Sequence, residues 1–409
     1  MPCLLEYGVD AYVDLDVPAE KLLAVCAEPL GEPLDDVAAA VEAGLARPLN
    51  YPSLAQASVP GDRIVLALEH SVPQATALVA AVANYLVERG TAADHIAVLG
   101  TPEAAAAGEH DPRERLPDAW RSEVTVEVHA PETKAGLSLL GSSHEGKAVY
   151  LNRSLLDADL VVPIGCLRSE PTIGYHGRYG GLFPSFADAK TRERYQKPAG
   201  PKTSRQRAVK EREEIDEIGW LLGTQFTVQV LPGGADRLLG VLAGEIPSVF
   251  REGQAAYDTA WSCQVPRRAS LVVASLSGGA EQQTWENLAR ALSAASRVTA
   301  EGGAVALCTD LALEPGQAVC GLSGDEDLSL VLRKIAREAH PDAVVALQLA
   351  QSLEQGKVYL LSRLDESLVE ELGMAPIEQA SDLGRLARKH ESCIVLANAQ
   401  YALPSAEAD

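Results

Sequence analysis

Short, unbroken apolar runs recur along this chain, and each is followed by a segment with the composition of a helix. Residues 63–68 (RIVLAL) precede a helical segment at 74–89, and residues 159–164 (DLVVPI) repeat the pattern. A strand with no polar alternation is buried on both faces, as in a parallel sheet that helices cover. The pattern therefore predicts an α/β fold.

The alternation of strand and helix continues to the end of the chain, with a helix expected at 284–296. The other strands that we expect lie at 96–99, 124–128, 270–276, 302–311, 343–347, 357–362 and 393–398. A chain of 409 residues exceeds one ordinary hydrophobic core. We therefore predict two α/β domains, residues 1–265 and 266–409, each with a largely parallel sheet covered by helices and with a ligand cleft between them.

The net charge and the cysteine content argue against some classes of protein. The formal net charge of −22 argues against nucleic acid as a partner, because a phosphate-binding surface needs a basic excess. The seven cysteines are odd in number and form no CxxC pair, which favours reduced thiols over a disulfide frame. No apolar run approaches the ~20 residues of a membrane helix, and the N-terminus alternates like a strand instead of resembling a signal peptide. We expect a cytoplasmic protein without a membrane partner.

The segment after Ile164 is the strongest candidate for a ligand site. Its glycines let the backbone approach a ligand closely, and loops at the carboxyl ends of strands are where open α/β sheets place their sites. The polar side chains that it carries are Arg168, Glu170, Tyr175, His176, Arg178 and Tyr179. Residues 187–218 follow with a dense run of charges, for which we expect a solvated helix or loop.

The order of several segments resembles the nickel-dependent lactate racemase family, whose better-known members carry a nickel-pincer nucleotide. The matching segments are 45–54 (LARPLNYPSL), 61–74 (GDRIVLALEHSVPQ), 95–104 (HIAVLGTPEA), 148–174, 269–292 and 361–380. The resemblance covers nearly the whole chain and implies the two-domain α/β fold. It also implies a site where histidines move protons and where arginine and lysine hold a substrate carboxylate.

The residues that the family uses are replaced at the matching positions. Val72 stands where the family has the arginine of its D-x-T-R-P turn, and Pro102 stands where it has a catalytic histidine. Gly180 falls on the cofactor-tethering lysine, and the nickel-binding histidine falls near Tyr195 or Gln196. Since glycine cannot form a covalent tether, the nickel-pincer nucleotide is implied by the resemblance but lacks its lysine and its histidine ligand. We predict no metal site.

Replacement residues at the same turns supply a different set of candidates. The proposed catalytic groups are His70, Glu170 and His176, in which Glu170 and His70 form an acid/base pair if they converge. The proposed substrate-binding groups are Arg168, Arg178, Tyr179, Glu281, Gln282 and Trp285. The proposed cofactor-binding positions are Gly180, Gly181, Gly278 and Gly279. Structural roles compete with these, because Glu170 can pair with either arginine and His70 can serve as a hydrogen-bond donor.

Two functions follow from the sequence. The first is an isomerase, a racemase or epimerase that acts on a small hydroxyacid or sugar acid. The second is a paralogue that is non-catalytic or free of cofactor and binds a small anionic organic acid or a protein partner. The missing lysine and histidine favour the second function, whereas the polar loop at 168–179 favours the first.

Overall fold

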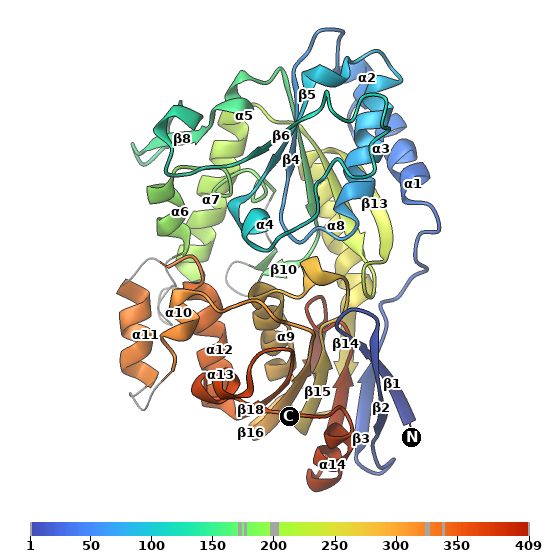
Figure 1. The fold of residues 1–409 in the computed structure, drawn as a ribbon, viewed down its shortest axis with the longest axis vertical. Helices are drawn as coiled ribbons and strands as arrows, with labels where there is room; N and C mark the ends of the chain where they lie inside the picture. Colours follow the sequence, from blue (N-terminus) through green and yellow to red (C-terminus); the bar gives the residue numbers. More distant parts are fainter. Residues whose placement is uncertain are drawn as a thin grey trace.

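The computed structural model describes residues 2–170, 174–175, 178–196, 204–323, 328–337 and 340–407. It consists of two lobes, each built on a twisted sheet with helices on both faces, as predicted (Figure 1). The first lobe lies at the top of Figure 1 and the second lobe at the bottom.

The sheet of the first lobe is parallel except at one edge, where β12 and β13 pair antiparallel. Its strands lie in the spatial order β13 (Leu238–Glu245), β12 (Phe226–Pro232), β9 (Leu160–Cys166), β4 (Ile64–Leu68), β5 (Ile96–Gly100) and β6 (Thr125–Val128). Every residue of β4 is buried, which is why its sequence shows no polar alternation. The predicted strands at 63–68, 96–99, 124–128 and 159–164 are thus confirmed.

The helices of the first lobe occupy the connections between these strands. They are α1 (Val37–Ala46), α2 (Leu54–Ala57), α3 (Ala75–Val87), α4 (Pro102–Ala106), α5 (Arg153–Asp157), α6 (Ala189–Gln196), α7 (Ser204–Leu222) and α8 (Ile246–Trp261). The hairpin of β7 (Leu137–Ser142) and β8 (Ala148–Asn152) lies beside α7. The charged segment 187–218 forms most of α6 and α7, so the expected helix is present where that segment is described.

The sheet of the second lobe is parallel throughout its described pairs. Its strands lie in the order β18 (Ala375–Pro376), β17 (Lys357–Leu361), β16 (Thr299–Cys308), β15 (Ala269–Ser275), β19 (Cys393–Leu396) and β3 (Leu22–Cys26). The N-terminal hairpin of β1 (Pro2–Tyr7) and β2 (Ala11–Asp16) packs on this sheet. The N-terminal strands therefore lie in the second lobe (Figure 1), while the boundary at 265/266 stays a prediction.

The helices of the second lobe are α9 (Trp285–Arg297), α10 (Gln317–Cys320), α11 (Leu328–Arg337), α12 (Ala343–Gln355), α13 (Glu366–Glu371) and α14 (Asp382–Lys389). The strand predicted at 343–347 is wrong, because these residues begin α12. Its buried residues, at positions 343, 345, 346, 349, 350 and 352, recur at the three- and four-residue spacings of a helix. A run of five apolar residues fits a buried helix as well as a buried strand.

The expectation that all cysteines are reduced is also wrong, because Cys26 and Cys263 form a disulfide with a Cα–Cα distance of 6.1 Å. Cys26 ends β3, and Cys263 lies in β14 (Ser262–Val265), which pairs with β20 (Leu403–Ala406) near the chain end. The two cysteines are 237 residues apart in sequence, and they meet because β3 joins the second sheet. None of the described helices has the length and apolarity needed to cross a membrane.

Candidate functional site

The carboxyl ends of strands from both sheets meet where the two lobes touch. The turn after β4 (69–74) lies against the turn after β15 (277–282), since the Gln282 side-chain amide donates to the Ser71 carbonyl at 3.2 Å. The hairpin between β12 and β13 reaches the same place, where the amide of Ala235 donates to Asn398 Oδ1 at 2.9 Å. Strand ends of both sheets therefore meet at this junction, which is where α/β proteins usually place their sites.

Glu69 and Arg168 are buried together at this junction, and both are less than 5% exposed. The Arg168 guanidinium lies 3.8 Å from the Glu69 carboxylate and donates to the carbonyl of His70 at 3.2 Å. Gly165 and Gly181 border Glu69 so closely that a Cβ at either position would collide with its carboxylate. Arg168, predicted to bind substrate, thus holds the turn that carries His70.

The other predicted binding residues near this junction also make structural contacts. Gln282 is fully buried, and its Oε1 accepts from the Tyr401 hydroxyl at 3.0 Å. Trp285 is 5% exposed in the core of the second lobe, and its indole donates to the Leu313 carbonyl at 2.9 Å. A backbone amide of the Gly278–Gly279 turn donates to the Asp236 carboxylate. A substrate or cofactor role for these residues stays a prediction.

Two other predicted residues of the glycine-rich segment, Arg178 and Tyr179, contact α7. Arg178 pairs with Asp216 at 2.8 Å, and the Tyr179 ring packs against Gly219. The backbone of Glu170 pairs with Gly174 in the short ladder of β10 (Ser169–Glu170) and β11 (Gly174–Tyr175). The side chain of Glu170 and the whole of His176 lie outside the described residues, so the proposed pairing of Glu170 with His70 stays a prediction.

A cleft of about 260 Å³ lies between the lobes and has His70 in its wall. The first lobe contributes α6, α7 and the segment from Gly180 to Ser185, and the second lobe contributes α9 and α12. Figure 1 shows α6 and α7 above α12. The lining side chains repeat at helical spacing, because each helix turns one face to the cleft. The predicted interdomain cleft is therefore present.

Two arginines place positive charge in the cleft wall. Arg192, on α6, pairs with Glu103 and donates to the carbonyl of Ser185. Arg290, on α9, donates from Nη1 to Asn287 Oδ1 at 2.7 Å and is 8% exposed. Neither arginine was among the predicted site residues, because both sit in helices whose cleft-facing side is set only by tertiary packing.

Two carboxylates with raised pKa values lie at the lobe junction and were also not predicted. Burial, together with the nearby Glu281 carboxylate, raises the pKa of Glu109 to about 7 and that of Asp236 to about 6. Glu109 accepts from the amide of Ser71 at 2.7 Å, which opposes the effect of burial. Neither residue could be predicted from the sequence, because each lies shortly after the end of a helix or strand and belongs to no recognisable motif.

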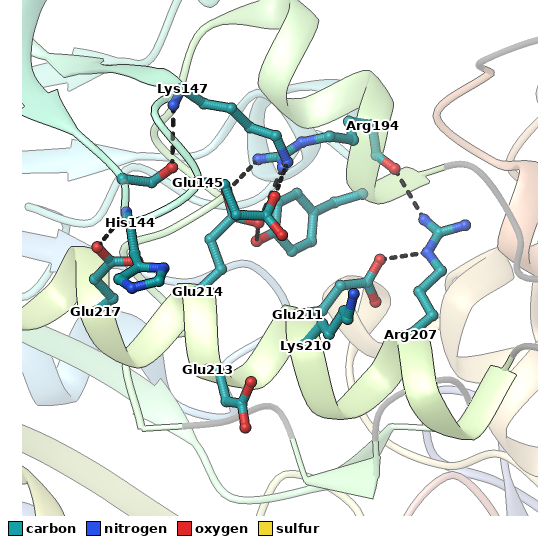
Figure 2. Close-up of a pocket in the computed structure, with 12 residues that line it drawn as sticks. His144, Glu145, Lys147, Arg194, Arg207, Lys210, Glu211, Glu213, Glu214 and Glu217 are labelled. Atoms are coloured by element: carbon teal, nitrogen blue, oxygen red, sulfur yellow. Dashed lines mark hydrogen bonds and ion pairs between the residues drawn. The ribbon is translucent and has the colours of Figure 1, made fainter.

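A second pocket of about 700 Å³ lies between the β7–β8 hairpin and α6–α7 (Figure 2). Its wall is an ion-pair network in which Glu214 accepts from Arg194 and from the Tyr195 hydroxyl. Lys147 pairs with Glu145 in the same pocket. Tyr195 also lines the interlobe cleft, so this network holds in place one residue of the cleft wall.

The cleft does not fit the lysine-tethered, histidine-ligated nickel group that the resemblance implies. Gly180, Tyr195 and Gln196, which stand at the tether and ligand positions, all line the cleft beside His70. Among the described side chains, none of those that line the cleft is a lysine, and His70 is the one histidine there. Across the described part of the chain, no cluster of three or more His, Cys, Asp or Glu side chains could hold a metal.

Comparisons with known proteins agree with the fold and with the sequence blocks. Residues 7–196 match the family model of the lactate racemase N-terminal domain. The lactate racemase apoprotein from Thermoanaerobacterium thermosaccharolyticum has a similar structure, with a TM-score of 0.76 at 15% identity over 99% of this chain and 100% of that chain. A structural-genomics target from Thermotoga maritima has a TM-score of 0.64 at 14% identity over 92% of this chain and 99% of that chain.

No functionally curated protein matches the sequence. The structural likeness at these identities shows the shared fold, while the family model identifies the domain that holds the turn after β4, the glycine-rich segment and α6. Residues 7–196 therefore match a lactate racemase N-terminal domain, and the chain as a whole has the fold of the lactate racemase apoprotein.

Proposed function

We propose that this protein binds a small organic acid anion in its interlobe cleft without a lysine-tethered nickel cofactor. The observation that carries the proposal is the set of cleft positions Gly180, Tyr195 and Gln196, which cannot tether or ligate such a cofactor. The cleft itself is retained, at about 260 Å³, just below the range of about 300–1,000 Å³ that small-molecule sites usually occupy.

Arg290 is the residue that we assign to the carboxylate of the ligand. A guanidinium presents several donors in one plane, a geometry that suits a carboxylate. His70 faces the same cleft from the first lobe and supplies a second polar contact. A ligand that touches both residues links the two lobes, so binding favours their closed arrangement.

Calorimetric titration with lactate, malate, gluconate and phenyllactate tests this function. We expect at least one acid to bind to protein made without cofactor-maturation enzymes, and Arg290→Gln to weaken that binding at least tenfold. Arg267→Gln, an exposed arginine outside the cleft, is the matched control and leaves affinity unchanged. Failure of every acid to bind contradicts the proposal.

A hydroxyacid racemase or epimerase is the second candidate, and the position of His70 in the cleft wall favours it. Its test is the conversion of single enantiomers of the same acids into their mirror images or epimers, followed by chiral chromatography, with protein co-expressed with the maturation enzymes of the nickel-pincer nucleotide. Conversion that requires stoichiometric nickel and disappears in His70→Gln supports the isomerase and contradicts cofactor-free binding.

A further inference from the structure

The chain passes from one lobe to the other at two places, which we call the first and the second crossover. The first crossover, residues 27–36, leads from the end of β3 in the second lobe to α1 in the first lobe (Figure 1). The second crossover, residues 262–268, leads from the end of α8 back to β15 in the second lobe. They run close together, since the amide of Leu30 donates to the carbonyl of Ala260, at the end of α8, at 2.9 Å. Rotation of one lobe against the other must bend both segments.

The Cys26–Cys263 disulfide joins the two crossovers to each other. Cys26 directly precedes the first crossover. Cys263 lies in the second crossover, midway between Trp261, which packs in the core of the first lobe, and Val265, which packs in the core of the second. The disulfide holds the α-carbons of the two cysteines 6.1 Å apart. It therefore sits at the hinge of the molecule and outside the centre of either sheet.

The hinge disulfide is open to reagents, whereas several of the free thiols are not. Cys26 and Cys263 are both partly exposed. Cys166, Cys308 and Cys393 are buried. Burial raises the pKa of the Cys308 and Cys393 thiols to about 12, so they hold almost no reactive thiolate near neutral pH. Since thiol–disulfide exchange needs access to a sulfur atom, a reductant can act at the hinge while these buried thiols stay inert.

We propose that the Cys26–Cys263 disulfide is a redox switch that controls the motion of the two lobes. A dithiol reductant opens it by exchange. A thiolate of the reductant attacks one of the two sulfurs and breaks the S–S bond, and the second thiol of the reductant then releases the mixed disulfide. Two electrons and two protons pass from the dithiol to the cystine, which becomes two thiols, and the reductant leaves as its own disulfide.

The state of this bond decides how the hinge bends. With the disulfide closed, the two crossovers are fastened to each other and bend as one unit. With the disulfide open, each crossover bends separately, and the lobes rotate over a wider range. The walls of the interlobe cleft come from both lobes, so this motion changes the width of the cleft. The switch acts in the same way whatever ligand the cleft binds, and it therefore goes beyond the proposed function.

The first measurement asks whether a dithiol reduces the pair in the folded protein. Wild type is treated with dithiothreitol, alkylated with iodoacetamide and mapped by mass spectrometry. We expect Cys26 and Cys263 to be alkylated only after reduction, and the exposed Cys320 to be alkylated with or without dithiothreitol. Cys308 and Cys393 are expected to stay unmodified. Oxidised glutathione should then restore the disulfide. A pair that resists dithiothreitol until the protein unfolds overturns the proposal.

The second measurement is the distance between two spin labels, obtained by double electron–electron resonance. The labels are attached to p-acetylphenylalanine in place of Lys134 in the first lobe and Glu354 in the second, two exposed residues, so that the cysteines stay free. Reduction, followed by removal of the reductant, is expected to widen the interlobe distance distribution about twofold. The matched control carries both labels in the second lobe, in place of Glu354 and the exposed Glu371, and its distribution stays unchanged.

Cysteine variants complete the test. The double variant with Cys26→Ser and Cys263→Ser is expected to show the wide distribution with and without dithiothreitol, whereas Cys320→Ser keeps the wild-type response. Equal interlobe distributions in oxidised and reduced wild type overturn the proposal. Equal widening in the control pair also overturns it, because the loosening then lies within a lobe. If the double variant does not fold, the comparison of oxidised and reduced wild type decides alone.

Discussion

Glu69 brings a carboxylate into the buried junction between the lobes, where a charge is costly unless it has a partner. The guanidinium of Arg168 supplies opposite charge at 3.8 Å, and the absence of side chains at Gly165 and Gly181 supplies the space. This arrangement fixes the turn after β4 and with it the position of His70. Gly181, one of the glycines in the segment after β9, thus has a specific steric role, which is to leave space for the Glu69 carboxylate.

Gly181→Ala is expected to lower the free energy of unfolding by about 1–3 kcal/mol, because its Cβ would overlap the Glu69 carboxylate in a packed interior. Urea denaturation followed by circular dichroism measures the change. Gly136→Ala is the control, since its Cβ would meet no atom within 4 Å. Equal losses in the two variants would show that the space beside Glu69 is not restricted.

Glu109 makes stability depend on pH in the direction opposite to that of an ordinary ion-paired carboxylate. Its pKa is about 7 in the folded protein, against an ordinary value of 4.5 for a solvated glutamate, so between these values the folded state holds the extra proton. The free energy of unfolding therefore falls as pH rises from about 4.5 to 7. Asp236, with a pKa raised to about 6, acts in the same direction.

Glu109→Gln is expected to raise the free energy of unfolding by about 3 kcal/mol at pH 8.5 and by less than about 1 kcal/mol at pH 5. Glutamine still accepts from the Ser71 amide but carries no charge to bury. Urea titrations at several pH values measure the effect, with the exposed Glu123→Gln as control. Parallel pH profiles for wild type and Glu109→Gln contradict this assignment.

At the level of single residues, sequence reasoning located strand ends but not the partners of the side chains there. His70 was predicted because it directly follows an apolar strand, and it lines the cleft. Glu109, Arg192 and Arg290 could not be predicted, since their positions depend on how α4, α6 and α9 pack across the lobes. Trp285 was predicted to bind substrate, and the core of the second lobe covers it.

At the scale of helices and strands, the apolar runs with clear boundaries predicted strands correctly. The local sequence pattern failed for α12 and could not place β3 in its sheet. Residues 343–347 were predicted as a strand but begin α12. The prediction failed because periodicity over five residues cannot distinguish a buried helix from a buried strand. The addition of β3 to the second sheet needs a pairing across more than 360 residues, from Leu22 to Cys393, and no local signal encodes that distance. The same pairing brings Cys26 to Cys263.

The Cys26–Cys263 disulfide is expected to fasten β3 to β14 and to contribute about 2–5 kcal/mol to stability. A reducing agent should therefore lower the melting temperature of the oxidised wild type and leave that of Cys263→Ser unchanged. Non-reducing peptide mapping should recover the cross-linked pair. Cys320→Ser, at an exposed free cysteine, serves as control and keeps the response to reductant. Equal melting temperatures with and without reductant in the wild type contradict this role.

Across the molecule as a whole, the two sheets point the carboxyl ends of their strands at one another, so turns from both lobes meet at the junction between them. Contacts across this junction include Gln282 with Ser71 and Ala235 with Asn398. The cleft lies beside these contacts and takes its walls from helices of both lobes. Motion of one lobe against the other therefore changes the distance between His70 and Arg290, the two residues assigned to the ligand.

Gln282→Met is expected to loosen this junction without disturbing the centre of either sheet. The substitution removes the donor to the Ser71 carbonyl and the acceptor of the Tyr401 hydroxyl, and it leaves that buried hydroxyl without this bond. We expect a loss of about 2–3 kcal/mol in the free energy of unfolding. Amide hydrogen exchange should become faster at 69–74 and 277–282 while β4 and β15 keep their protection. Gln264→Met, at an exposed position of β14, is the control. Unchanged exchange at both turns would mean that Gln282 does not hold the lobes together, and the cleft would then depend on the Asp236–Gly279 and Ala235–Asn398 contacts alone among the junction contacts named above.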